Sequence, residues 1–373
     1  MTAFSERPGR PDLLVVTPML FGSGGCAVYY TLLTKALVNC GYRVTVVSER
    51  LPRGASGLPG SEYIGLLTPR SSVELGVARN APLYALNNLE LLRLGHVTRR
   101  VMPRSVLIHT GLLNRAGPFR MYLPKYAQTC RDDGIKLVAD ARDNLLPEEQ
   151  IPLLDCFDEV VCCSLNVVNR IEAGLAQRSA AHHIPVMFDL PKPDRERAAR
   201  ALARVGCHGP FLLYVGALKD DKGVSTILKS FHRLQDTDLA GYDLVLAGPM
   251  KRVRRESRAL MKNTRVKRVG AVPHRVALGL MEEAACCVNV SPSEGMPRAS
   301  LEAMGANGCV VLPPGIPEFE AHAPAAVCDP PTEAELSAHL TKLGREGWPR
   351  TTSYPLGEHA EDRVIPLYEQ VLF

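Results

Sequence analysis

Two glutamates flank the start of an expected helix in the stretch Ser291-Pro-Ser-Glu-Gly-Met-Pro-Arg-Ala-Ser-Leu-Glu302. Glu294 precedes the helix, and Glu302 lies two turns inside it. Gly295 allows close backbone approach, and the first amides of a helix attract anions. The stretch could therefore bind a phosphate between two carboxylates that accept hydroxyl hydrogen bonds. Spacing alone is equally compatible with Glu294 stabilising the positive helix end and Glu302 lying on a solvated face.

A lysine earlier in the same half of the chain could complete such a site. Lys222 ends the stretch Tyr214-Val-Gly-Ala-Leu-Lys-Asp-Asp-Lys222, which begins in a strand-like run. A cation here could neutralise the charge that develops on a leaving phosphate. The alternative is a solvated lysine in a loop before a helix.

Chemically useful side chains of the first half also follow strand-like runs. His109 ends the run Ser105–His109, and Arg142 with Asp143 follows Lys136–Asp140. Ligands of parallel sheets bind beyond the carboxyl ends of the strands, so these residues could face a ligand. The alternatives are a structural histidine at 109 and an Asp–Arg salt bridge in the loop that contains Arg142.

Alternating strands and helices are expected to position these groups, which favours doubly wound parallel sheets. The expected buried strands are 13–17, 43–48, 105–109, 136–140, 159–164, 183–188, 211–215, 242–247, 286–290 and 309–312. The expected helices are 27–40, 223–234, 276–285, 298–307 and 359–372, with an exposed arginine-rich helix at 251–268. The alternation is interrupted by a polar, proline-marked stretch after Asp189, which predicts a boundary at 190 between two Rossmann-like halves.

Composition narrows the class of protein. The chain has 373 residues, a net charge of +5 spread over both halves, and 46% hydrophobic residues. A soluble two-domain protein is expected, and nucleic acid is a poor candidate for a partner. The 11 cysteines follow no disulfide or zinc spacing, so we expect reduced thiols and a cytoplasmic location. The polar start is unlike a signal peptide.

Several segments together resemble retaining GT-B glycosyltransferases of family 4. The stretch 294–304 resembles their Glu-x7-Glu signature, and 214–223 resembles their "YVGRLxxxKG" segment. Leu246–Pro249, Val269–His274 and Gly315–Glu318 resemble later segments in the same order, and Gly24-Gly25 resembles the glycines of the first loop. Because these matches are ordered along the chain, they are more specific together than any one motif alone.

The resemblance implies a fold and an activity. The fold is α/β of the GT-B type, with two Rossmann-like domains whose parallel sheets face each other across a cleft. Residues 1–190 would bind the acceptor and 191–355 the donor, with a C-terminal helix at 356–373 returning to the first domain. The implied activity is transfer of a glycosyl group, of the hexosyltransferase type, from a nucleotide diphosphate sugar, with a UDP-sugar as the expected donor. A small molecule, a natural product or a cell-envelope glycan would supply the acceptor hydroxyl.

The resemblance also implies residue roles. Glu302 would bind the ribose hydroxyls, Glu294 the donor sugar, and Lys222 the diphosphate. The remaining donor-binding positions would be Gly24, Gly25, Gly216, Lys219, Val272, His274, Gly295, Met296, Pro297 and Arg298. His109 would bind the acceptor.

Two departures from the family pattern affect catalysis. Ala217 replaces an arginine that usually helps to hold the diphosphate, and Lys219 or Arg298 could substitute for it. Where many relatives have a histidine that faces the sugar, this chain has Arg142-Asp143, which resembles an "RDxWPE" variant; either residue could take the catalytic place.

Alternative functions remain open at this stage. A non-catalytic nucleotide-sugar binder and a nucleotide-sugar epimerase both suit the same fold. Gly22-Ser-Gly-Gly-Cys-Ala27 fits a dinucleotide fingerprint, but the loop before it is too long for that fold. The basic, apolar segment 91–104 is compatible with weak peripheral membrane contact and with a packed helix. No metal or other cofactor is expected, and the sequence leaves the acceptor, the linkage, the nucleotide base and the oligomeric state open.

Overall fold

The computed structural model describes residues 11–17, 25–49, 57–67, 93–113, 116–142, 146–175, 179–251, 253–306, 308–350 and 354–373. The chain forms two compact units, one of Met1–Met187 with His359–Phe373 and the other of Phe188–Glu358. The boundaries expected from the sequence, after residues 190 and 355, each lie three residues from the observed ones. Each unit is described by itself below.

The N-terminal unit contains a seven-stranded parallel sheet in the order β3-β2-β1-β4-β5-β6-β7. The strands are β1 (Leu13–Val16), β2 (Val44–Glu49), β3 (Glu62–Leu67), β4 (Ser105–His109), β5 (Lys136–Ala141), β6 (Glu159–Cys162) and β7 (Ala180–His183). The chain order reverses between β1 and β4. Such a reversal creates a crevice at the carboxyl ends of the strands, where ligands of doubly wound folds bind.

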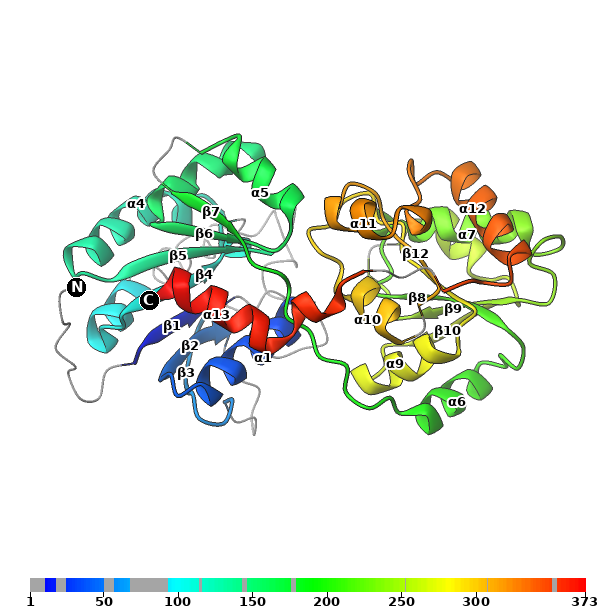
Figure 1. The fold of residues 1–373 in the computed structure, drawn as a ribbon, viewed down its shortest axis with the longest axis horizontal. Helices are drawn as coiled ribbons and strands as arrows, with labels where there is room; N and C mark the ends of the chain where they lie inside the picture. Colours follow the sequence, from blue (N-terminus) through cyan, green and yellow to red (C-terminus); the bar gives the residue numbers. More distant parts are fainter. Residues whose placement is uncertain are drawn as a thin grey trace. The chain divides into compact units, whose positions relative to one another are not determined.

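Helices cover both faces of this sheet (Figure 1). They are α1 (Gly25–Asn39), α4 (Ala116–Asp132), α5 (Leu165–Glu172) and α13 (Glu361–Leu372), with 3-10 segments at Thr110–Leu112 and Glu148–Cys156. The C-terminal helix α13 packs on α1, β4 and β5. The last helix of the chain is therefore part of the first unit.

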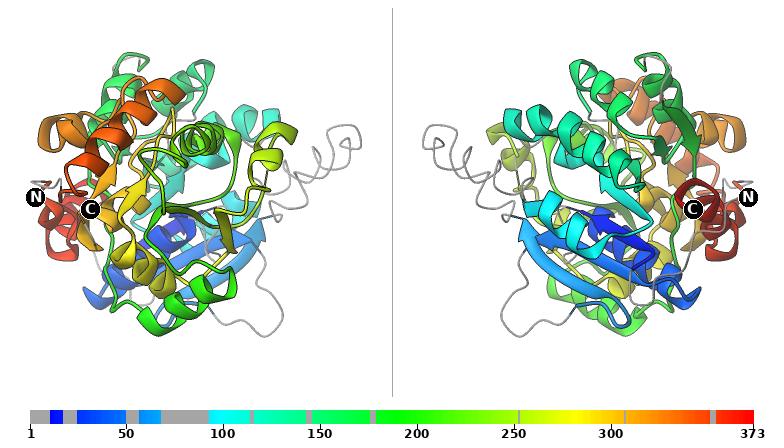
Figure 2. Two further views of the ribbon diagram at one scale, coloured as in Figure 1. Left: turned by 90° about the vertical axis from the view of Figure 1, so that its right-hand side faces the viewer. Right: turned by 90° about the vertical axis from the view of Figure 1, so that its left-hand side faces the viewer.

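The C-terminal unit contains a five-stranded parallel sheet in the order β10-β9-β8-β11-β12. The strands are β8 (Phe211–Val215), β9 (Asp243–Ala247), β10 (Val266–Gly270), β11 (Cys286–Val288) and β12 (Val310–Val311). The helices are α6 (Arg195–Arg204), α7 (Val224–Leu234), α8 (Arg255–Leu260), α9 (His274–Glu283), α10 (Arg298–Ala306), α11 (Pro317–His322) and α12 (Glu333–Arg345). Figures 1 and 2 show the sheet between helices on its two faces.

The two helix layers of the C-terminal unit have different roles. Helices α7 and α12 contact each other and bury Phe231 and Leu340 in a large apolar core with the strands. Helices α6, α9 and α10 form the other layer, in which α9 contacts both α6 and α10. The second layer contains the start of α10, where the two signature glutamates lie.

The sequence predictions were wrong at three strands. β3 was not predicted, and β7 spans 180–183 rather than 183–188. The helix expected over 251–268 is wrong in extent, because only Arg255–Leu260 forms an α-helix there and Val266–Gly270 forms β10. All three strands lie at sheet edges. In β10, Lys267 and Arg268 interrupt the continuous apolar run that identifies a central strand, which an edge strand tolerates.

Candidate functional site

Lys222 and Glu294 form an ion pair in the C-terminal unit. The Nζ of Lys222 donates a hydrogen bond of 2.8 Å to Oε1 of Glu294. Lys222 ends the 3-10 turn Asp220–Lys222 that follows β8, and Glu294 follows β11. Because β8 and β11 are adjacent and parallel, the segments after their carboxyl ends meet at one edge of the sheet. The structure thus brings together two residues that lie in different motifs of the sequence.

Gly223 fixes the position of the turn that presents Lys222. Its φ is +74°, in the left-handed region, which favours glycine. A Cβ at this position would lie 2.5 Å from the carbonyl oxygen of Val290, between β11 and Glu294. Close backbone contact between these two loops therefore requires glycine at 223.

The loop after β8 is held by hydrogen bonds to its backbone. The amide of Gly216, whose φ is +155°, donates to the carbonyl of Ala247 at 2.9 Å. The hydroxyl of Tyr214 donates to the carbonyl of Ala217 at 3.0 Å. Burial, together with the charge of Glu294, raises the pKa of Tyr214, so this hydroxyl keeps its proton at neutral pH. Lys219 lies at the end of this loop, half-buried, immediately before the turn.

Glu302 is the centre of a second cluster. Its side chain projects from α10 and is only 5% exposed. Its Oε1 accepts hydrogen bonds from Nε2 of His274 at 2.9 Å and from Nε of Arg298 at 2.7 Å. His274 begins α9 and Arg298 begins α10, so two neighbouring helices hold one carboxylate. Val272, also predicted to bind the donor, is half-buried in the loop before α9.

The protonation state of Glu302 follows from these contacts. Burial by itself would raise the pKa of its carboxyl group, but the hydrogen bond from His274 and the charge of Arg298 outweigh burial and lower the pKa. Glu302 is therefore ionised at neutral pH and can act as a hydrogen-bond acceptor. Spacing alone also allowed a solvated Glu302, and the structure excludes that alternative.

The start of α10 can bind an anion. Gly295, Met296 and Pro297 are buried immediately before it, and the amides of the first helical turn have no acceptor within their own helix. The amide of Ser300 donates to the carbonyl of Pro297 at 2.9 Å. Asn289, which sequence reasoning did not identify, donates from Nδ2 to Oγ of Ser300 at 3.0 Å and ties the segment after β11 to α10.

In the N-terminal unit, Arg142 forms a buried ion pair with Asp140 at the end of β5. The Nε of Arg142 lies 2.6 Å from Oδ1 of Asp140, and their side chains are 4% and 0% exposed. The guanidinium carbon lies 4.1 Å from the ring centroid of Tyr29. Burial would lower the pKa of Arg142, but the nearby Asp140 carboxylate and tyrosines raise it, so the charge is retained.

Three tyrosines connect this ion pair to the helices. Tyr30 of α1 donates to Oδ2 of Asp140 at 2.6 Å. The hydroxyls of Tyr29 and Tyr368 are 2.6 Å apart, which links α1 to α13. Sequence reasoning did not identify this cluster, because its members are far apart in the chain and each resembles an ordinary core residue.

The remaining predicted residues of the N-terminal unit have varied positions. His109 is buried at the end of β4, where its Nδ1 accepts from the amide of Gly111 at 2.8 Å and its ring meets Tyr30 edge-on. Gly25 begins α1. Gly24 and Asp143 lie outside the described residues. Acceptor binding by His109 stays a prediction.

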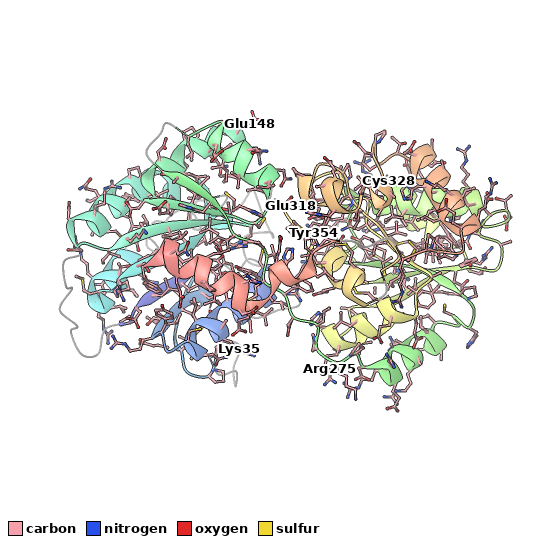
Figure 3. All side chains as sticks on the ribbon, in the orientation of Figure 1. Lys35, Glu148, Arg275, Glu318, Cys328 and Tyr354 are labelled. Carbon is pink, nitrogen blue, oxygen red and sulfur yellow. The ribbon has the colours of Figure 1, made fainter. Side chains whose placement is uncertain are left out.

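Tyr354 and Glu318 lie close together in the C-terminal unit (Figure 3). Glu318 belongs to the segment Gly315–Glu318, which resembles a donor-side loop of the family, and Tyr354 was not predicted to take part in the site. Burial raises the pKa of Tyr354, and the charge of Glu318 adds to the effect. Glu320, two residues on, accepts from the amide of Gly315 at 2.9 Å and closes this loop.

Among the described residues, no group of three or more His, Cys, Asp or Glu side chains is placed to hold a metal ion. Two carboxylates two residues apart, Asp236 and Asp238, face Arg265 and Arg345 instead. Within the same described ranges, no helix is both long enough and apolar enough to cross a membrane.

Residues 206–352 match the family model described as glycosyl transferases group 1. This range lies inside the C-terminal unit and includes Lys222, His274, Glu294 and Glu302. The match is confined to the C-terminal unit and covers less than half of the chain. No curated protein sequence matches the chain.

Solved structures match almost the whole chain. A sucrose-phosphate synthase from Thermosynechococcus elongatus matches with a TM-score of 0.70 and 17% identity, over 97% of this chain and 96% of that chain. The fold is GT-B. A UDP-forming α,α-trehalose-phosphate synthase from Burkholderia xenovorans, in complex with glucose-6-phosphate, matches with a TM-score of 0.68 and 12% identity, over 98% and 100% of the two chains. An E. coli structure with UDP-2-fluoro glucose matches with a TM-score of 0.63 and 13% identity, over 96% and 95%.

Proposed function

We propose that this chain is a retaining glycosyltransferase that uses a nucleotide diphosphate sugar, with a UDP-sugar as the expected donor. The observation that carries the proposal is the Lys222–Glu294 ion pair at 2.8 Å. Both residues lie at the carboxyl edge of the C-terminal sheet, and Glu294 lies four residues before the first residue of α10. A cation, a carboxylate and the first amides of a helix in one place suit a diphosphate that is joined to a sugar.

Each group has a distinct role in the proposed reaction. Lys222 and the first amides of α10 bind the diphosphate, and Glu294 accepts hydrogen bonds from hydroxyls of the donor sugar. Glu302 binds the ribose. Lys222 also separates the Glu294 carboxylate from the phosphates, which would otherwise repel it.

The proposed chemistry depends on charge stabilisation. As the bond between the sugar and the phosphate breaks, negative charge grows on the leaving diphosphate and is stabilised by Lys222 and the helical amides. A leaving phosphate oxygen accepts the proton of the acceptor hydroxyl, and the acceptor oxygen bonds to the anomeric carbon on the face that the diphosphate leaves. The anomeric configuration is therefore retained. The protein contributes position and electrostatics and forms no covalent intermediate.

The solved structures with a similar fold suggest which acceptors to test first. The solved structures described above include a sucrose-phosphate synthase and a trehalose-phosphate synthase, the second of which contains glucose-6-phosphate. Sugar phosphates therefore join small molecules, natural products and cell-envelope glycans among the acceptors to be tested for this chain.

The proposal is tested with a screen of these acceptors against several UDP-sugars and GDP-sugars, in which mass spectrometry detects the products and NMR determines their anomeric configuration and the identity of the sugar. A glycosylated acceptor with an unchanged anomeric configuration supports the proposal. A donor that binds but is never consumed would indicate a nucleotide-sugar binder. Conversion of one nucleotide sugar into another, with no acceptor and no free sugar, would indicate an epimerase.

A further inference from the structure

Arg298 occupies a position that is unfavourable for the stability of its helix. It begins α10, and a cation at a helix N-terminus opposes the macrodipole. Its side chain is only 10% exposed. Its Nη1 is buried and has no hydrogen-bond partner among the residues that the structure describes, and an unsatisfied buried donor costs free energy. The helix dipole and the unpaired Nη1 therefore both disfavour an arginine at this position, and its favourable contact within the helix is the ion pair with Glu302.

The contacts of the Arg298 side chain give a better reason for an arginine at this position. Its Nε is 2.7 Å from Oε1 of Glu302, one turn further along α10. The Nε2 of His274, which approaches the same oxygen at 2.9 Å, must carry a proton to donate to it. The Nη2 of Arg298 is 3.4 Å from that His274 nitrogen, so this approach is between two donors. The two side chains converge on one oxygen of one carboxylate.

The carboxylate that they hold is suited to a diol. Both hydrogen bonds are made to Oε1 of Glu302, and within the described part of the chain the second oxygen, Oε2, is left for another donor. The carboxyl group is kept ionised although it is buried. A fixed, ionised carboxylate with one uncommitted oxygen can accept hydrogen bonds from adjacent hydroxyl groups at little cost in reorganisation.

We propose that Arg298 is a positioning residue for ribose recognition: with His274, it fixes the Glu302 carboxylate so that the site selects nucleoside diphosphates with an intact 2′,3′-diol. The inference rests on the proposed function, because it needs a nucleotide at this site. It goes beyond that function in assigning Arg298 an action through Glu302 rather than through the diphosphate. It makes the ribose, and not only the phosphates, a determinant of donor selection.

The test compares the affinities for UDP and for 2′,3′-dideoxy-UDP by calorimetry, with GDP and 2′,3′-dideoxy-GDP as a second pair. The wild type is expected to prefer the ribonucleotide by about tenfold or more. Arg298→Leu is expected to reduce that preference to below about threefold by weakening the ribonucleotide alone. Arg298→Lys, which keeps a cation near Glu302, is expected to restore part of the preference.

Arg258→Leu is the matched control. It removes the same charge from an exposed position on α8, which packs on α7 in the other helix layer, and it should leave the preference unchanged. If Arg298→Leu does not fold, Arg298→Gln replaces it, since glutamine keeps a donor and loses the charge. The preference of Arg298→Gln should fall by more than about threefold.

Three results bear on the inference differently. An equal loss of affinity for the ribonucleotide and the dideoxynucleotide in Arg298→Leu overturns it, because Arg298 would then act on the diphosphate. An unchanged preference in the folded Arg298 variants also overturns it. A wild type that binds neither UDP nor GDP overturns the proposed function itself, and with it the nucleotide on which the inference depends.

Discussion

Lys222 and Glu294 are 72 positions apart in the sequence, and their side chains form a hydrogen bond of 2.8 Å. Two adjacent parallel strands bring them together, and Gly223 lets the turn that presents the lysine pack on the backbone after β11. In the unliganded chain each charge therefore neutralises the other. A diphosphate that arrives beside Lys222 meets a cation whose position is already fixed.

Gly223→Ala tests whether this backbone contact is needed. A methyl group there would lie 2.5 Å from the carbonyl oxygen of Val290, in a conformation that L-residues rarely adopt, so the turn must move. We expect donor turnover to fall by about tenfold or more while the thermal melting temperature falls only modestly. Gly241→Ala, also at positive φ but with open space around it, is the control. Equal turnover in the two variants would contradict the positioning role of Gly223.

Glu302→Ala tests the ribose site. The ribose hydroxyls would lose their acceptor, so the affinity for UDP and GDP should fall by about 1–3 kcal/mol. Calorimetric titration of the free nucleotides measures this directly. Affinities equal to those of the wild type would remove the assignment of Glu302.

Arg142→Leu tests the buried cluster of the N-terminal unit. The change would leave the Asp140 carboxylate fully buried without its cation, so the free energy of unfolding should fall by about 3–5 kcal/mol. The double variant Asp140→Leu/Arg142→Leu should recover much of that loss. Urea unfolding measures both. Lost turnover with an unchanged free energy of unfolding would favour instead the catalytic role that the sequence suggested for Arg142.

Activity is expected to survive EDTA. The proposed leaving-group stabilisation comes from Lys222 and the amides of α10, which do not depend on a metal ion. Turnover assayed after chelation and gel filtration should equal that of the untreated protein. Turnover that vanished with EDTA and returned with Mn²⁺ would contradict the proposal.

The fold was predictable where hydrophobic patterning was strong. Central strands such as Leu13–Val16 and Phe211–Val215 are nearly continuous apolar runs and were found within one or two residues of their bounds. The strand Val266–Gly270 was not, because Lys267 and Arg268 interrupt its apolar residues at the sheet edge. A strand that is buried on both faces is a continuous apolar run in the sequence, whereas an edge strand can contain charged residues that interrupt the run.

The sequence predicted which residues belong to the candidate site, but it did not predict which of their side chains contact each other. Motif order identified Lys222, Glu294 and Glu302, but periodicity contains no information about which side chains meet across a sheet edge. The partnership of His274 with Glu302 depends on α9 and α10 lying side by side. An Asp–Arg salt bridge after β5 was one of the alternatives, but the burial of the Asp140–Arg142 pair was not predicted, because a buried charged pair at a strand end contradicts the usual pattern of burial.

The central claim is that the Lys222–Glu294 site acts on a nucleotide diphosphate sugar. Lys222 should matter more to turnover than to donor affinity, because its attraction grows as charge moves onto the leaving phosphate. Ala217→Arg should restore part of the turnover lost in Lys222→Ala if position 217 faces the diphosphate. Lys219→Ala and Arg298→Ala show whether another cation stabilises the leaving diphosphate in place of Lys222.

The most direct measurement is the release of nucleoside diphosphate from UDP-sugars and GDP-sugars by the wild type and by Lys222→Ala, with donor affinities measured in parallel. The account predicts release by the wild type and release at least about 100-fold slower by Lys222→Ala, with a smaller change in affinity. Normal release by Lys222→Ala, Lys219→Ala and Arg298→Ala alike would contradict the placement of the diphosphate, and with it the catalytic account.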